Sequence, residues 1–70
     1  MTDVPSPVTG VVWKLQKQPG DTVAEGEVIL ILESMKMEIP IESPFAATVQ
    51  QVWVAEGDSV AEGQPVARIG

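Results

Sequence analysis

The 70-residue sequence contains no cysteine and no histidine. Without cysteine no disulfide can form, and without either residue a structural zinc site is not expected, because such sites use thiolates and imidazoles. A domain of this size has a small core and often depends on such cross-links. We therefore expect stability to come from close packing of valine, isoleucine, leucine and the two tryptophans, with no metal bound. The absence of cysteine also fits a reducing compartment.

Cationic side chains are scarce, with four Lys and Arg residues against ten Asp and Glu residues and a formal net charge of −6. Nucleic acids and anionic membranes attract clusters of cations, so the composition argues against both as partners. No apolar run approaches the roughly 20 residues that a membrane-spanning helix needs. The first residues have neither the basic start nor the apolar stretch of a signal peptide. We expect a cytoplasmic protein whose partners are other proteins.

Catalytic side chains are also few. Tyrosine is absent along with histidine and cysteine, no serine has an evident base, and no pair of carboxylates forms a recognisable pocket motif. We therefore do not expect the chain to be an enzyme in its own right.

Glycine and proline interrupt the sequence at short intervals, six of each, and no window carries apolar residues at helical spacing. The Val- and Ile-rich runs between them predict β-strands and an all-β fold. The run 28–32 is apolar throughout, as expected of a strand buried on both faces, and its β-branched residues argue against a helix. Val11, Trp13 and Leu15 should share one face of their strand. The predicted strands are 3–5, 10–17, 22–23, 28–32 and 37–42.

The chain contains an internal repeat. Shifted by 37 residues, segment 6–33 aligns with segment 43–70 without a gap and with nine identities in 28 positions. The identities include the Gly-Asp pairs at 20–21 and 57–58, which we interpret as tight turns and not as ion-binding loops. Two copies are too few for a solenoid, so they should pack face to face as one domain, a two-sheet sandwich or flattened barrel. Residues 33–42 are expected to belong to neither copy.

Between the copies, the motif ESMKME at 33–38 predicts a β-hairpin with Met35 and Lys36 as its two-residue loop. The resulting cross-strand pairs are Ser34 with Met37, Glu33 with Glu38, Leu32 with Ile39, and Leu30 with Ile41. The last two pairs are apolar, which supports this register. Two features are unfavourable: such turns need positive φ, which usually selects Gly, Asn or Asp, and the two glutamates place like charges opposite each other.

Lys36 has two interpretations on the residues alone. It could be an ordinary solvated lysine, with Met35 and Met37 as gap-filling side chains. Alternatively, its amine could be acylated by another enzyme, so that a long uncharged arm on a rigid hairpin visits several active sites. The methionines would then offer polarizable surface to a partner. The strained loop and the position between the copies weigh for the second interpretation, but both stay open.

The motif resembles the biotin attachment motif of biotinyl domains, in which a Met-Lys-Met triplet carries biotin on its lysine. The resemblance covers nearly the whole chain and includes the Ser-Pro starts of both halves, the paired Gly-Asp turns and the stretch SPFAA at 43–47. Small stand-alone biotin/lipoyl attachment proteins are also similar over the run from Glu33 to Ile41. Ser34 stands where the family most often has alanine, which leaves the assignment of the lysine intact but could alter recognition by a ligase.

The resemblance implies a fold as well. Members of the family are flattened β-barrels of two four-stranded antiparallel sheets with quasi-twofold symmetry, in agreement with the repeat. Some bacterial carrier domains have a protruding loop, or thumb, inserted in the first half. Because the two halves align here without a gap, we expect no thumb.

The resemblance further implies a function. Biotin protein ligase would use ATP to attach biotin to Lys36, beside Met35 and Met37. A biotin carboxylase component would then carboxylate the biotin ring, and a carboxyltransferase component would pass the carboxyl group to an acceptor such as an acyl-CoA. The domain itself would be a carrier without catalytic activity, monomeric in isolation. The residues expected to guide the ligase are Glu33, Ser34 and Glu38.

Two alternatives remain. Lipoyl domains share the fold and modify a hairpin-tip lysine, although their usual motif is Asp-Lys-Ala, so Met35 and Met37 favour biotin. An unmodified interaction module, such as the barrel-like part of an efflux or membrane-fusion adaptor, often lacks the Met-Lys-Met turn. The aromatic residues are expected to be structural: Trp13 and Trp53 as core or half-buried packing groups, and Phe45 inside the core.

Overall fold

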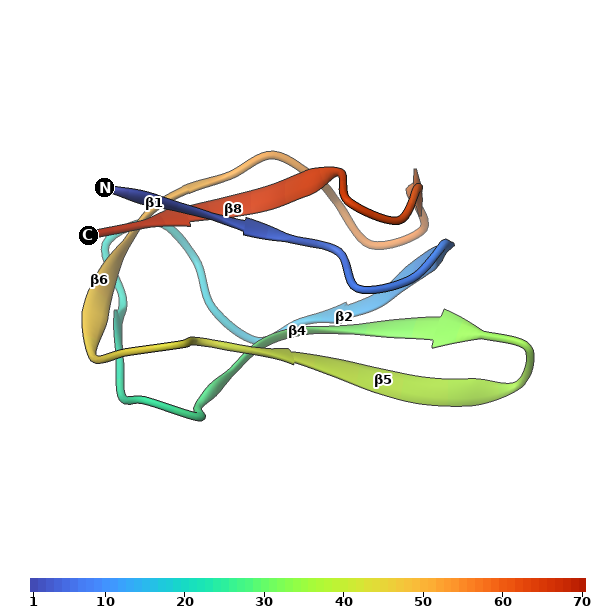
Figure 1. Cartoon of the computed structure of the whole chain (residues 1–70), viewed down its shortest axis with the longest axis horizontal. Coiled ribbons are helices and arrows are strands. Elements are labelled where there is room, and N and C mark those ends of the chain that lie inside the picture. Colours follow the sequence, from blue (N-terminus) through green and yellow to red (C-terminus); the bar gives the residue numbers. More distant parts are fainter.

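The computed structural model describes all 70 residues and consists of eight β-strands without a helix, so no helix could cross a membrane. The strands are β1 (Thr2–Pro5), β2 (Gly10–Leu15), β3 (Thr22–Val23), β4 (Val28–Ser34), β5 (Met37–Glu42), β6 (Ala47–Val52), β7 (Ser59–Val60) and β8 (Pro65–Ile69). They form two antiparallel four-stranded sheets, in the orders β1-β8-β6-β3 and β5-β4-β2-β7 (Figure 1). The predicted all-β class and two-sheet barrel are confirmed.

The repeat of the sequence is a repeat of the structure. An offset of 37 residues carries β2 onto β6 and β3 onto β7 with identical bounds, and the connections between equivalent strands have equal lengths. The first half therefore has no inserted thumb, as predicted. One expectation is corrected: residues 39–42 do belong to the second copy, because β5 is the edge strand of its sheet just as β1 is of the other. Only Met35 and Lys36 separate the strand that ends the first copy from the strand that begins the second.

The two copies interlock, because each sheet contains strands of both. Backbone hydrogen bonds of 2.8 Å join the turn of each copy to a strand of the other. In the first turn, the Gly20 N–H donates to the Val49 C=O, and the Asp21 C=O accepts from the Val49 N–H. In the second turn, the Gly57 N–H donates to the Val12 C=O, and the Asp58 C=O accepts from the Val12 N–H. Gly20 and Gly57 have φ of 97° and 95°, a conformation that favours glycine. The aspartate carboxylates accept hydrogen bonds from backbone N–H groups of their own turns. The Gly-Asp pairs are therefore tight turns, as predicted.

One cluster of thirteen buried apolar residues forms the core between the sheets. Its members are Val4, Val12, Val23, Ile29, Leu30, Leu32, Ile41, Val49, Val54, Val60, Val66, Ala67 and Ile69. The prediction that Val11, Trp13 and Leu15 share one face of β2 is wrong for Leu15. Val11 and Trp13 are exposed, and Val12 between them is buried. A β-bulge between Val12 and Lys14 shifts the register against β4, so that Leu15 lies opposite the buried Leu30 and packs against the core.

A second bulge alters β4. The register against β5 shifts between Val28 and Leu30, so that Ile29 and Leu30 are both buried although they are neighbours in sequence. Val28 and Ile31 are only half-buried, so the strand is not covered equally on both faces as its composition predicted.

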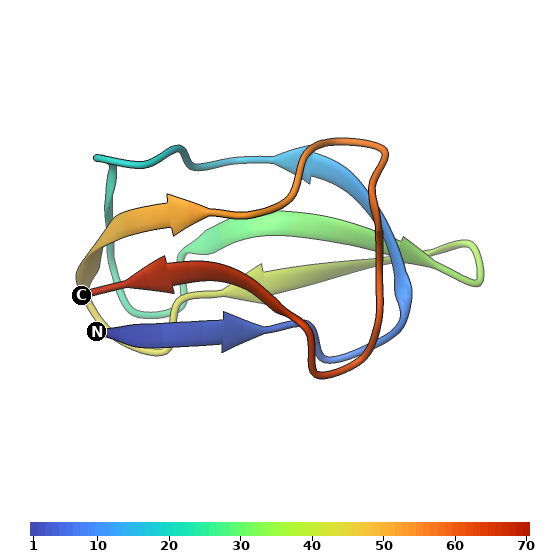
Figure 2. The same ribbon diagram turned by 90° about the horizontal axis from the view of Figure 1, so that it is seen from above.

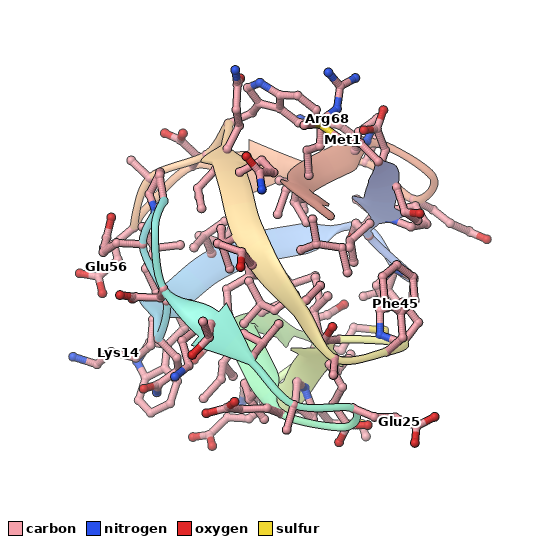
Figure 3. The ribbon with its side chains drawn as sticks, turned by 90° about the vertical axis from the view of Figure 1, so that its left-hand side faces the viewer. Met1, Lys14, Glu25, Phe45, Glu56 and Arg68 are labelled. Carbon is pink, nitrogen blue, oxygen red and sulfur yellow. The ribbon has the colours of Figure 1, made fainter.

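The aromatic side chains lie outside the core. Phe45 is 40% exposed and points away from the body in Figure 3, so the prediction that it fills the core is wrong. Trp13 and Trp53 are partly exposed, and each lies beside a cation: Lys14 Nζ is 5.7 Å from the ring centroid of Trp13, and Arg68 Cζ is 5.2 Å from that of Trp53. These cation–π contacts stabilise surface positions, and the aliphatic residues alone build the core.

Two salt bridges lie on the surface, Lys17 Nζ to Glu27 Oε2 at 2.8 Å and Arg68 Nε to Asp3 Oδ1 at 2.7 Å. The hydrogen bond from Arg68 lowers the pKa of Asp3 below its ordinary value of 3.8. The hydrogen bond from Lys17, helped by the backbone N–H of Ala24, lowers the pKa of Glu27 below 4.5. In acid the folded chain therefore binds fewer protons at these two groups than the unfolded chain.

Because both pKa values are depressed by folding, the stability from these pairs is present above the ordinary values of 3.8 and 4.5 and is lost as pH falls through the folded values. We expect the melting temperature to fall from about pH 5 to pH 3. The fall should be smaller in the Asp3→Asn, Glu27→Gln double variant and at high salt, since exposed pairs are screened. An identical fall in the double variant, measured by thermal scans across this pH range, would contradict this account.

Candidate functional site

The β4–β5 hairpin projects beyond the body at the end opposite the two termini (Figures 1 and 2). Its strands pair in the predicted register, with Ser34 opposite Met37, Glu33 opposite Glu38, Leu32 opposite Ile39 and Leu30 opposite Ile41. The apolar pairs anchor the hairpin to the core, because Leu30, Leu32 and Ile41 are buried. The loop consists of Met35 and Lys36, as the sequence predicted.

Both loop residues have a left-handed backbone. Met35 has φ of 52° and Lys36 has φ of 66°, and they are the only residues other than glycine with positive φ. A two-residue loop of this kind follows the twist of its strands, but it costs each L-residue about 1–2 kcal/mol. Neither residue is a usual choice for the turn, so local stability does not explain why Met and Lys stand there. Local rules broken in this way are typical of functional positions.

The amine of Lys36 is free. The side chain is exposed, and its Nζ takes part in neither of the two salt bridges. The other three cations are engaged within the protein: Lys17 and Arg68 in ion pairs, and Lys14 over the ring of Trp13. Lys36 is thus the one lysine whose amine has neither an ion-pair nor a cation–π partner, and it lies in the two-residue loop of the hairpin. These properties suit an amine that must enter the active site of another enzyme and become acylated there.

Met35 and Met37 lie on either side of this amine and are 93% and 63% exposed. Neither packs against the core, so they are not gap-filling side chains. Exposed methionines give a flexible, polarizable apolar surface that adapts to a partner. The structure therefore places the predicted Lys36, Met35 and Met37 together at one accessible tip.

A family model with the description "biotin-requiring enzyme" matches residues 2–69, which is nearly the whole chain. The chain belongs to the biotin/lipoyl attachment family. Among its relatives, the biotin/lipoyl attachment protein of Bacillus subtilis (strain 168) is 45% identical over 56 residues, covering 80% of this chain and 77% of the relative. The biotinylated protein TB7.3 homolog of Mycobacterium leprae is 37% identical over 67 residues, covering 96% and 94%.

Among solved structures, the urea carboxylase of Kluyveromyces lactis matches with a TM-score of 0.93 and 32% identity. The match covers 99% of this chain but only 6% of the carboxylase. The family thus includes small proteins about as long as this chain as well as domains within much longer ones. The fold and the family that the sequence predicted are both confirmed.

The loop end of the hairpin is braced by Thr9 and by Gly10 at the start of β2. The Ser34 hydroxyl donates a hydrogen bond of 2.9 Å to the Thr9 carbonyl, and Thr9 Oγ1 accepts one of 3.1 Å from the backbone N–H of Glu62. A Cβ on Gly10 would lie 2.7 Å from the Glu33 carbonyl oxygen, so only glycine fits there. The sequence analysis missed Thr9 and Gly10, although a glycine within a strand often marks such a close approach. Ser34, predicted to guide a ligase, has this internal bond as its observed contact.

Two glutamates, Glu33 and Glu38, flank the Met35-Lys36 loop on the two strands of the hairpin. Glu33 and Glu38 are direct cross-strand partners, both are exposed, and neither takes part in a salt bridge. With Lys36 between them, the tip carries one positive and two negative charges. Acylation would remove the positive one and leave an acidic tip.

A surface hollow lies elsewhere, between the edge strands β1 and β5, and includes no residue of the tip. It is lined by Thr2, Asp3, Val4, Pro5, Pro7, Pro40, Ile41, Glu42 and Pro44. The prolines are consistent with unpaired edges, because proline cannot donate to a ladder. No group of three or more His, Cys, Asp or Glu side chains could hold a metal ion. The site thus consists of the tip, and not of a pocket.

Replacement of Met35 and Lys36 by the preferred turn sequence tests whether this loop destabilises the fold. In the Met35→Asn, Lys36→Gly double variant both residues tolerate positive φ, so we expect unfolding free energy to rise by about 1 kcal/mol. The matched Met35→Leu variant should change it by less than about 0.5 kcal/mol, since the side chain is exposed. Urea denaturation of the three proteins provides the measurement. Destabilisation by the Asn-Gly turn would show that the loop is not strained.

Proposed function

We propose that Lys36 carries biotin in amide linkage and that the domain is the biotin carboxyl carrier of a biotin-dependent carboxylase. The proposal rests on the exposed amine of Lys36, which lies in a left-handed turn between two exposed methionines. Membership of the biotin/lipoyl attachment family and the biotinylated relative in Mycobacterium leprae support this proposal.

Attachment requires Lys36 to act as a nucleophile in the active site of biotin protein ligase. The ligase first joins the biotin carboxylate to the AMP part of ATP, with release of pyrophosphate. Nζ then bonds to the carboxyl carbon, the bond from that carbon to the AMP oxygen breaks, AMP leaves, and the amine loses its proton. The hairpin assists because it enters a partner's cleft without displacing the core, and its backbone is fixed by cross-strand pairing. Met35 and Met37 provide the apolar contact surface on both sides of the entering amine.

Once attached, biotin supplies a ring nitrogen that can hold a carboxyl group. This chain contributes position and reach: the lysine stem rotates freely while the braced hairpin keeps its origin fixed. The partners are a biotin carboxylase and a carboxyltransferase, as subunits or as domains of the same chain. The domain needs no catalytic residue for this work, in keeping with a chain that has neither histidine nor cysteine.

The acidic residues of the tip are proposed to guide the ligase. Glu33 and Glu38 keep two exposed carboxylates opposite each other, an arrangement that costs roughly 0.2–1 kcal/mol and contributes nothing to the fold. Such charges steer association with a basic partner surface. Ser34 acts with them by holding the loop end of the hairpin against Thr9.

A lipoyl carrier is the second candidate, because the Bacillus subtilis relative is named for both cofactors. The same lysine would then bear lipoate, and the partners would be enzymes of acyl transfer. The two methionines beside Lys36 favour biotin. Intact mass after incubation with each ligase and its cofactor separates the two, because the added masses differ.

Substitution of the attachment lysine tests the proposal directly. The unmodified chain should gain one biotin when incubated with biotin protein ligase, ATP and biotin, as seen by intact mass and streptavidin binding. Lys36→Arg should gain none, because a guanidinium keeps the charge but is not acylated, and its fold should be unchanged. The matched Lys14→Arg variant should be labelled like the wild type. Full labelling of Lys36→Arg would overturn the site.

Charge reversal at the tip tests the steering role. We expect Glu38→Lys to lower the kcat/KM of biotinylation about three- to tenfold at low salt, with a smaller effect at high salt. Glu25→Lys is the matched control, since Glu25 lies on the end of the molecule away from the hairpin (Figure 3). Equal rates for the two variants, or an effect independent of salt, would rule out steering by Glu38.

A further inference from the structure

The distribution of sulfur in this chain is unusual. There is no cysteine, so the three methionines contain all of its sulfur. Two of them flank Lys36 with exposures of 93% and 63%, while Met1 is 85% exposed and lies beside Gly70 at the opposite end (Figure 2). An oxidant in solution therefore meets two of the three thioethers at the tip of the hairpin, with no thiol in the chain to react first.

We propose that Met35 and Met37 are sites of oxidation to methionine sulfoxide, and that this modification slows the acylation of Lys36. The second part rests on the proposed function. The oxidant is hydrogen peroxide: its O–O bond breaks, one oxygen atom bonds to the thioether sulfur, and the other leaves as water. Sulfur loses two electrons and the peroxide gains them, and methionine sulfoxide reductases reverse the change.

Oxidation here alters the surface without altering the fold. Neither side chain packs against the core cluster, and the hairpin is held by backbone pairing and by the buried Leu30 and Leu32. The added oxygen turns a flexible apolar side chain into a polar, chiral one. An enzyme that encloses the lysine must cover both neighbouring side chains, and it would then have to bury two strongly polar groups without matched partners. Recognition is thus weakened at the tip while stability stays unchanged.

The experiment compares each protein with its own oxidised form. The unmodified domain and the Met35→Leu, Met37→Leu double variant are treated with hydrogen peroxide, and peptide mass mapping locates the added oxygen atoms. Biotin protein ligase kinetics and thermal unfolding are then measured before and after treatment. The double variant retains Met1, so it reports any effect of oxidation away from the tip.

We expect oxygen on both Met35 and Met37, a fall of about tenfold in kcat/KM for biotinylation of the wild type, and an unchanged melting temperature. The double variant should keep its own rate after treatment, and methionine sulfoxide reductases should restore the rate of the wild type. An equal rate for the doubly oxidised wild type, or an equal fall in the double variant, would overturn the inference. A complete lack of biotinylation before oxidation would instead overturn the proposed function.

Discussion

The two-residue connection between the copies is the constraint on which the rest of the structure depends. The last strand of the first copy, β4, pairs directly with the first strand of the second, β5, and only Met35 and Lys36 join them. So short a connection forces both residues into the left-handed region. It also places their side chains beyond the end of the sheet, where no core residue can cover them. The duplicated scaffold thus creates one exposed apex, and Lys36, the proposed attachment site, lies there.

The body beneath the apex obtains its rigidity from the interlocking of the copies. Each copy supplies a turn whose backbone N–H and C=O groups bond to a strand of the other, so neither copy is complete alone. This arrangement gives a chain without cysteine a closed network around a small aliphatic core. Such rigidity suits a carrier domain, because the backbone of the hairpin must stay in place while different partners bind the group on the lysine side chain.

Much of this could be predicted from the sequence, since the features concerned are local. The alternation of apolar residues on both sides of the motif fixed the register of the hairpin, and the repeated Gly-Asp pairs fixed the turns. The equivalence of β1 and β5 could not be seen, because segments 2–5 and 39–42 share no identical residue. They share only a buried aliphatic side chain at the same place, Val4 in one and Ile41 in the other.

The errors concern packing between distant segments. The bulge in β2 turns Leu15 toward the core, on the opposite side from Val11 and Trp13, and it arises from pairing with β4, which no local pattern reports. Phe45 lies outside because small β-branched and aliphatic residues already fill the narrow space between the sheets. The bracing of the hairpin by Thr9 and Gly10 joins residues 25 positions apart, so it required the fold to be known first.

The scaffold displays Lys36 at the tip, and the fold does not depend on what that side chain carries. Backbone amide NMR spectra of the chain before and after biotinylation test this most directly. The account predicts that shifts are confined to residues 33–38 and that amides of the core strands and of both Gly-Asp turns keep their positions. Shifts that spread through β2, β6 or β8 would contradict it, because they would show that the loaded arm binds and reshapes the body.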